Sequence, residues 1–187
     1  IAITGSCGKT TLKELLGNSL RKISKVSISP KSYNNKYGVP LSLFNLDHKD
    51  DYGVLEVGMD KKGEIDYLSK IIEPDISVIT NINFAHAKNF EDIKHIASAK
   101  AEIIDNTKLN GYVVLNGDDK FFTFHKKKAL RKNLNVISFS IKNKKSNIKL
   151  ININQKEKKF KIFVKINNQK KHFIISNNFQ NNIYNIL

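Results

Sequence analysis

The feature that most constrains this chain is a glycine-rich turn between a short apolar segment and an amphipathic one. The turn reads Thr4-Gly5-Ser6-Cys7-Gly8-Lys9-Thr10-Thr11. Glycines allow the backbone N–H groups to point at a phosphate, and the positive end of the following helix adds to the attraction. The segment therefore predicts a phosphate-binding loop, in which Lys9 neutralises phosphate charge and Thr10 holds Mg²⁺. The alternative is a tight strand-to-helix turn with an incidental lysine.

Beyond this turn, short apolar segments alternate with segments of helical periodicity up to Ser140. Such alternation is typical of βα units that build a mostly parallel sheet flanked by helices. The expected strands are Ile1–Thr4, Val26–Ile28, Tyr52–Val57, Ile76–Thr80, Tyr112–Leu115 and Asn135–Phe139. The expected helices are Lys9–Lys22, Pro40–Phe44, Gly63–Ile72, Glu91–Asn106 and Asp118–Arg131. The predicted fold class is therefore α/β, with a sheet of the P-loop type.

The pattern changes after Ser140. A polar connector, Lys142–Asn147, leads into residues 148–175, where apolar and polar residues alternate with period two. Three antiparallel strands, with turns near residues 155–157 and 167–169, account for this alternation. We therefore divide the chain into a phosphate-binding core at 1–140, a small antiparallel β subdomain at 141–176, and the start of a helix at 177–187.

Composition limits the classes of protein that this chain can be. A length of 187 residues with 40% hydrophobic residues allows a buried core. The single cysteine, Cys7, cannot form an intramolecular disulfide, and no apolar run approaches the roughly 20 residues that cross a bilayer. We therefore expect a cytoplasmic protein without membrane insertion. The net charge of +15 leaves a nucleic-acid-binding module open, although the excess is lysine scattered among Asn and Ile without stacking aromatics.

Polar residues at the ends of two further apolar segments are candidates for a metal site. Glu56 lies near the end of the run Gly53–Gly58, and an acid among such neighbours is costly unless it is paired or binds a metal. Asn81 and His86 follow the apolar segment that ends at Thr80. Open α/β sheets bind their ligands at the edge where the carboxyl ends of the strands meet. The alternatives are an ordinary edge glutamate and a structural histidine.

Together these segments resemble the Mur ligase family, whose members join an amino acid or a peptide to a UDP-sugar-peptide. The resembling segments occur in order and cover nearly the whole chain. They are the turn at 4–11 with Lys13, Asn34–Leu41, Glu56–Met59 with Gly63–Ile65, Thr80–Ile82 with Ala85–His86, Ala99–Ile103, and Leu115–Asp119. Near the end, Phe179–Asn185 resembles the family's adenine-contacting segment at Asn182 and Asn185 and departs from it at Phe179 and Asn181.

The resemblance implies roles for individual residues. The residues expected to bind ATP are Gly5, Ser6, Cys7, Gly8, Lys9, Thr10, Thr11, Asn182 and Asn185. One Mg²⁺ would be held by Thr10 and Glu56, and a second by His86 and Lys100. Lys100, which by itself reads as a solvated helix lysine, would carry a carbamate formed with carbon dioxide. The expected catalytic residues are Lys9, His86 and Lys100, and Asn34, Asn35 and Asn81 are expected in active-site loops.

The implied activity is ATP-dependent amide formation through an acyl phosphate. The paired Asn34 and Asn35 and the run Gly63–Ile65 favour the members that add D-alanyl-D-alanine to UDP-N-acetylmuramoyl-tripeptide in peptidoglycan synthesis. The partners would be these small molecules, without nucleic acid, and we expect a monomer. Family members also have an N-terminal UDP-sugar domain and a C-terminal amine-binding domain, which this sequence lacks, so we expect a fragment. Another Mur-type ligase, such as a folylpolyglutamate synthase, and a basic nucleic-acid-binding module remain alternatives.

Overall fold

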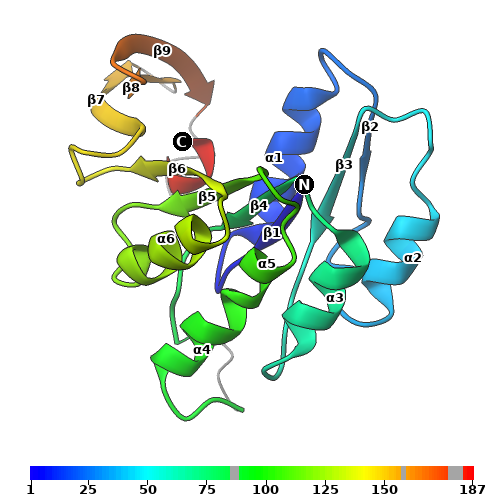
Figure 1. The fold of residues 1–187 in the computed structure, drawn as a ribbon. Helices are drawn as coiled ribbons and strands as arrows, with labels where there is room; N and C mark the ends of the chain where they lie inside the picture. Colours follow the sequence, from blue (N-terminus) through cyan, green and yellow to red (C-terminus); the bar gives the residue numbers. More distant parts are fainter. Residues whose placement is uncertain (85–88, 157–158, 177–182) are drawn as a thin grey trace.

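In a computed structural model, the chain forms a nine-stranded sheet with helices on both faces (Figure 1). The structure describes residues 1–84, 89–156, 159–176 and 183–187. The strands are β1 (Ala2–Thr4), β2 (Val26–Ile28), β3 (Tyr52–Glu56), β4 (Ile76–Ile79), β5 (Tyr112–Asn116), β6 (Asn135–Ser140), β7 (Ile148–Lys156), β8 (Lys159–Ile166) and β9 (Gln169–Ser176). The helices are α1 (Lys9–Leu20), α2 (Gly38–Phe44), α3 (Glu64–Ile72), α4 (Ile93–Lys100), α5 (Glu102–Asp105), α6 (Phe122–Arg131) and α7 (Ile183–Ile186).

The strands lie in the order β2-β3-β1-β4-β5-β6-β7-β8-β9. Pairing is parallel from β2 to β7 and antiparallel between β7, β8 and β9. The predicted α/β class, with a mostly parallel sheet and antiparallel strands near the end of the chain, is confirmed. Because β1 lies between β3 and β4, the residues that follow these three strands meet at one edge of the sheet.

The predicted elements are present with bounds that shift by up to four residues, as in α6, which begins at Phe122 rather than Asp118. Two differences are larger. The helix predicted over Glu91–Asn106 is two helices, because α4 ends and α5 begins around Ala101. The antiparallel strands also continue the main sheet, since β7 pairs with β6 through Phe139↔Ile148 and Ser140↔Lys149. The division of the chain at residue 140 stays a prediction. Of the stretch 177–187, predicted as the start of a helix, residues 183–187 are described, and Ile183–Ile186 form α7.

Two apolar clusters cover the two faces of the parallel sheet. On one face, Leu12, Leu16 and Leu20 of α1 pack on Ile3, Val54 and Val78. On the other face, side chains of α2 to α6 pack on alternate strand residues, among them Ala2, Ile79 and Leu115. A third cluster, built on Phe160, Ile162 and Val164, joins the antiparallel strands to α7. In the parallel strands, successive apolar side chains point alternately to the two faces of the sheet, so both faces are buried under helices.

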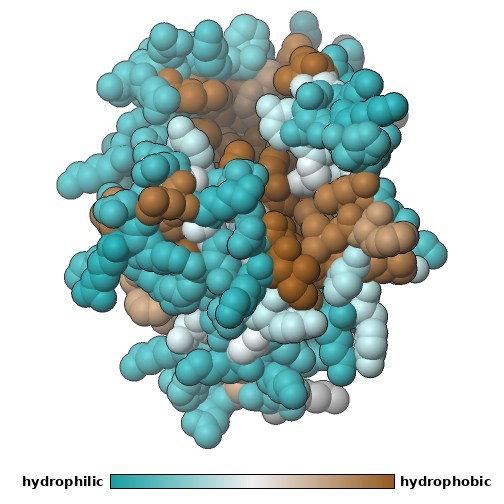
Figure 2. Space-filling model, turned by 45° about the vertical axis from the view of Figure 1, so that its right-hand side comes forward, coloured by the Kyte–Doolittle hydropathy of each residue, from teal (hydrophilic) through white to brown (hydrophobic). Residues whose placement is uncertain are grey.

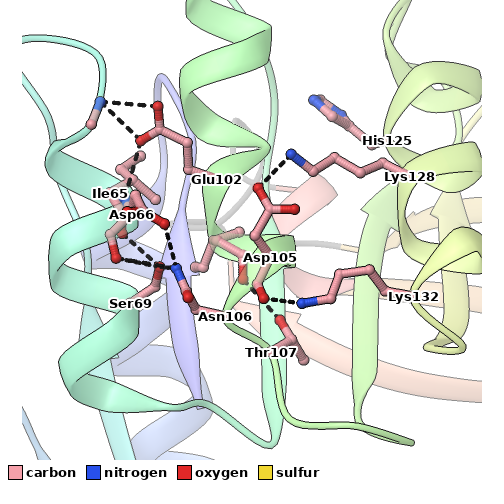
Figure 3. A network of polar contacts seen from close by, with 12 residues as sticks. Ile65, Asp66, Ser69, Glu102, Asp105, Asn106, Thr107, His125, Lys128 and Lys132 are labelled. Atoms are coloured by element: carbon pink, nitrogen blue, oxygen red, sulfur yellow. Dashed lines mark hydrogen bonds and ion pairs between the residues drawn. The ribbon is translucent and has the colours of Figure 1, made fainter.

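The break between α4 and α5 brings a buried carboxylate to the start of α3 (Figure 3). Glu102 is 9% exposed, and its carboxylate accepts hydrogen bonds from the backbone N–H of Gly63 at 2.9 and 3.1 Å and of Asp66 at 3.0 Å. Neither N–H has a partner within its own helix, so Glu102 caps α3 from another element. The same contact ties the residues after β3 to the end of α4.

Replacing Glu102 by alanine is expected to destabilise the chain by about 1–2 kcal/mol, because two N–H groups at the start of α3 lose their acceptor. The midpoint of urea unfolding measures this change. Glu91→Ala is the matched control, since the side chain of Glu91 is 92% exposed and should cost less than about 0.5 kcal/mol. Equal midpoints for the two variants would show that the cap contributes nothing.

Some apolar side chains are exposed on α2 and α3. Leu41 and Phe44 on α2 are 48% and 87% exposed, and Ile71 on α3 is 43% exposed. Figure 2 brings this side of the molecule forward and shows hydrophobic side chains among hydrophilic ones. Among the described residues, no helix is long and apolar enough to cross a membrane.

Candidate functional site

The glycine-rich turn leaves β1 and leads into α1 as the sequence predicted. Gly5 and Gly8 have φ angles of +148° and +81°, which favour glycine, and Gly8 is the N-cap residue of α1. The turn is held from the end of β4. The Thr80 hydroxyl donates to the Cys7 carbonyl at 2.7 Å, and the Asn81 side chain bonds the Cys7 N–H and carbonyl, both at 3.0 Å. Asn81 therefore supports the loop.

Replacing Gly5 by alanine is expected to disrupt this loop. A Cβ at Gly5 would lie 1.9 Å from Thr80 Oγ1, at a φ that side chains rarely adopt. We expect a loss of about 2–3 kcal/mol of stability, measured by urea unfolding. The matched variant is Gly63→Ala, which also has a positive φ, +89°, but would meet nothing within 4 Å, so it isolates the backbone strain from the collision. Equal losses in both variants would contradict a collision with Thr80.

A buried carboxylate lies beside the first turn of α1. Glu56, at the end of β3, is 1% exposed. Its Oε2 accepts a hydrogen bond from Thr10 Oγ1 at 2.7 Å, and its Oε1 accepts one from Asn34 Nδ2 at 2.7 Å. The Glu56 N–H donates to Ser29 Oγ at 3.2 Å. A threonine hydroxyl and a carboxylate that converge next to a phosphate-type loop suit Mg²⁺, which prefers oxygen ligands and keeps several waters and phosphate oxygens.

Few side chains at this place could act as ligands for a metal ion. Within the described part of the chain, no group of three or more His, Cys, Asp or Glu side chains could hold a metal ion. A cation that needs an all-protein cage is therefore not favoured by these residues, whereas Mg²⁺ shared with a nucleotide's phosphates needs only one or two carboxylates. The residues present fit that ion.

A cavity of about 1000 Å³ opens at the same edge of the sheet, and both Lys9 and Lys100 line it. Lys9 Nζ donates to the Gly5 carbonyl at 3.0 Å. Lys100, at the end of α4, is 5% exposed. Burial, and secondarily the positive charge of Lys9, lower the pKa of Lys100 to about 7. From its sequence context alone, Lys100 resembles a solvated helix lysine. In the structure it is instead a buried amine that faces a cavity.

The structure places most of the other predicted site residues. Asn35 lines the cavity, and its side-chain oxygen accepts from the N–H groups of Tyr37 and Gly38 at the start of α2. Asn185, on α7, lies close to the glycine-rich turn: a Cβ on Gly8 would lie 2.8 Å from its Oδ1. Ser6 lines the cavity, Cys7 is exposed in the loop, and Thr11 lies in the first turn of α1. His86 and Asn182 lie outside the described residues.

Several residues near the site were given no individual role from the sequence. Lys13, named there only together with the resembling turn, is completely buried. The remaining cavity wall includes the side chains Lys36, Tyr37, Lys61, Lys62, Tyr67 and Phe90. Lys36 and Tyr37 follow the paired asparagines, and Lys61 and Lys62 lie between two glycines. Their positions in loops after strands were the available signal, but nothing in their residue types distinguished them from surface residues.

Comparison with known proteins gives one consistent result. The model of the Mur ligase middle domain matches residues 3–187. The UDP-N-acetylmuramoyl-tripeptide--D-alanyl-D-alanine ligase of Buchnera aphidicola subsp. Acyrthosiphon pisum is 43% identical over 156 residues, which cover 80% of this chain and 34% of that protein. The crystal structure of MurF ligase from Thermotoga maritima in complex with ADP superposes with a TM-score of 0.88 at 30% identity, covering 99% of this chain and 42% of that chain.

More distant likeness extends to the fold alone. A mutant of L. casei FPGS has a TM-score of 0.69 at 14% identity, covering 93% of this chain and 52% of that chain. The chain spans about a third of the length of the curated relatives it matches. Because the family model covers nearly all of the sequence, this chain belongs to the Mur ligase family and corresponds to its middle domain.

Proposed function

We propose that this chain is the ATP- and magnesium-binding part of a ligase that adds D-alanyl-D-alanine to UDP-N-acetylmuramoyl-tripeptide in peptidoglycan precursor synthesis. The observation that carries the proposal is the convergence of Thr10 and Asn34 on the buried Glu56 carboxylate, beside a cavity lined by Lys9 and Lys100. The names of the relatives at 36–43% identity support this choice of substrates.

The proposed reaction has two steps. The terminal carboxylate of the UDP-sugar-tripeptide attacks the γ-phosphate of ATP, which forms an acyl phosphate and releases ADP. The amine of D-alanyl-D-alanine then attacks the acyl carbon, the amide bond forms, and phosphate leaves as the amine loses its proton. Phosphoryl transfer of this kind depends on positioning and on neutralising charge, and Lys9 is placed in the loop to supply a positive charge.

Thr10 and Glu56 are the residues that we assign to one Mg²⁺. Mg²⁺ supplies charge neutralisation at phosphate oxygens and orients them. We further propose that Lys100 carries a carbamate, which turns a cation into an anionic ligand, and that it shares a second Mg²⁺ with His86. A cytoplasmic location and a monomeric state also stay proposals.

Magnesium-dependent nucleotide binding tests the core of this proposal. Isothermal titration calorimetry of the chain with ATP, at fixed ionic strength with Mg²⁺ or with EDTA, should give binding that requires Mg²⁺. Glu56→Gln keeps the size and most hydrogen bonds of Glu56 but removes its charge, and it should weaken Mg²⁺-dependent binding by about tenfold or more. Leu109→Gln is a control, because Leu109 is 72% exposed.

The alternative of a nucleic-acid-binding module makes the opposite prediction. Binding to mixed-sequence oligonucleotides that is tight and falls steeply with salt, together with no binding of Mg²⁺-ATP, would replace the ligase proposal. The net charge of +15 is the observation that favours this alternative.

A further inference from the structure

Lys13 is a buried lysine that has no part in the phosphate transfer proposed above. It lies one helical turn after Lys9 and Thr10 on α1, and it is 0% exposed. It is not among the residues that line the cavity, so it does not face the proposed substrates. A lysine ammonium removed from water is costly unless all of its donors are paired.

The partners of Lys13 are backbone carbonyls of the segment that follows β2, which we define as the 29–35 segment. Lys13 Nζ donates to the Ser29 carbonyl at 2.5 Å and to the Lys31 carbonyl. Its third neighbour is Glu14 Oε1 at 3.4 Å. Lys31 has a φ of +45°, a conformation that few non-glycine residues adopt, so the bond to Lys13 holds a strained turn in place.

The 29–35 segment is also the segment that holds the metal-site carboxylate. Ser29 Oγ accepts the Glu56 N–H at 3.2 Å, and Asn34 Nδ2 donates to Glu56 Oε1 at 2.7 Å. The Asn34 carbonyl accepts the Gly58 N–H at 2.7 Å, which ties the segment to the residues after β3. Because Asn34 binds Oε1, the other carboxylate oxygen of Glu56, Oε2, faces Thr10.

We propose that Lys13 is a positioning residue: by binding the Ser29 and Lys31 carbonyls from α1, it holds Asn34 on Glu56 and so sets the orientation of the carboxylate toward Thr10. Helix α1 therefore contributes twice to the metal site, directly through Thr10 and through Lys13 on its next turn. The inference deepens the proposed function, because the oriented carboxylate matters only if this edge of the sheet binds a metal with nucleotide.

Hydrogen exchange without any ligand is the first test. In Lys13→Met, the amide of Gly58 should exchange at least about tenfold faster than in the wild type, because the segment that accepts its hydrogen bond is released. Amides of β5 and β6 should keep their wild-type rates. Lys22→Met, at an exposed lysine near the end of the same helix, is the matched control and should change neither. Unchanged exchange at Gly58 in folded Lys13→Met would overturn the proposal whether or not the chain binds nucleotide.

The magnesium dependence of ATP binding is the second test. Lys13→Met should raise the Mg²⁺ concentration at half-saturation about tenfold, and Asn34→Ala should do the same. Because both act through one hydrogen bond to Glu56, the double variant should be no worse than Asn34→Ala alone. Effects that multiply in the double variant would show that Lys13 acts on the site independently of Asn34, which would also overturn the proposal.

A milder substitution covers the case in which Lys13→Met does not fold. The same measurements are then made on Lys13→Gln, whose amide can still donate to one carbonyl and which should show a smaller change in the same direction. If the wild type does not bind Mg²⁺-ATP, the proposed function fails, and the exchange experiment still decides the role of Lys13.

Discussion

A full-length ligase that contains this domain is expected to lose amide formation by about a thousandfold when Lys9 is replaced by alanine. Lys9 follows the left-handed Gly8, and its Nζ reaches back to the Gly5 carbonyl across the loop. The ammonium is therefore placed where a triphosphate would meet the N–H groups of the loop. Because charge moves onto the leaving phosphate oxygens during transfer, loss of this cation should lower kcat as well as ATP affinity.

Phosphate release under saturating substrates measures the change in kcat. Lys22→Ala, an exposed lysine near the end of α1, is the control and should keep wild-type turnover. Lys9→Arg separates charge from shape, because a guanidinium keeps the charge but does not match the compact ammonium, and it should recover little activity. Turnover within about threefold of the wild type in Lys9→Ala would remove Lys9 from the mechanism.

The hydrophobic pattern predicted the sheet well because its strands are buried. β5, for example, contains the apolar run Val113, Val114 and Leu115, because helices cover both faces of the sheet. The hairpin turn between β8 and β9 was also visible, because Asn167 and Asn168 tolerate the positive φ angles, +45° and +73°, that a two-residue turn requires. In contrast, the break at Ala101 could not be predicted, since the run around it consists of good helix formers.

The site was only partly readable from the sequence. The glycine-rich turn and Glu56 were predicted as site residues from local pattern, because a glycine turn after a strand and an acid among apolar residues are both unusual in themselves. Lys13 and Lys100 were not, since a lysine is normally solvated and its burial depends on which elements pack around it. For Lys100, only the family resemblance suggested a role. For Lys13, the acceptors are backbone carbonyls, which carry no signature in the sequence.

Glu102 links the end of α4, where Lys100 lies, to the start of α3. Glu102 lies two residues after Lys100 and accepts hydrogen bonds from N–H groups at the start of α3, next to the loop that lines the cavity. Asn106, one turn later, donates to the Asp66 carbonyl at 3.1 Å and to Ser69 Oγ at 3.0 Å (Figure 3). The end of α4, where Lys100 lies, is therefore anchored to α3 by several polar contacts. This anchoring gives Lys100 a defined place in the cavity wall.

In a full-length ligase that contains this domain, replacing Lys100 by alanine is expected to reduce amide formation by about a thousandfold, and small carboxylates such as acetate or formate should restore part of it. The variant removes the side chain that we propose to carry the carbamate, and a free carboxylate can supply the missing anionic oxygens in the same cavity. Leu109→Ala, at an exposed site, is a control that should neither lose activity nor respond to acetate. Wild-type turnover in Lys100→Ala without rescue would rule out the carbamate.

The carbamate itself should depend on pH in a direction set by the burial of Lys100. Carbon dioxide reacts only with a neutral amine, and burial, followed by repulsion from Lys9, lowers the pKa of this amine from 10.5 to about 7. In the unfolded chain the amine stays charged up to its ordinary pKa of 10.5, so the free-energy cost of burying it is largest below about pH 7 and falls progressively as pH rises from about 7 to 10.5. With ¹³C-labelled bicarbonate, a carbamate signal should therefore be weak at pH 6 and strong at pH 8, and absent from Lys100→Ala. A signal of equal strength in the variant would place the modification on another amine.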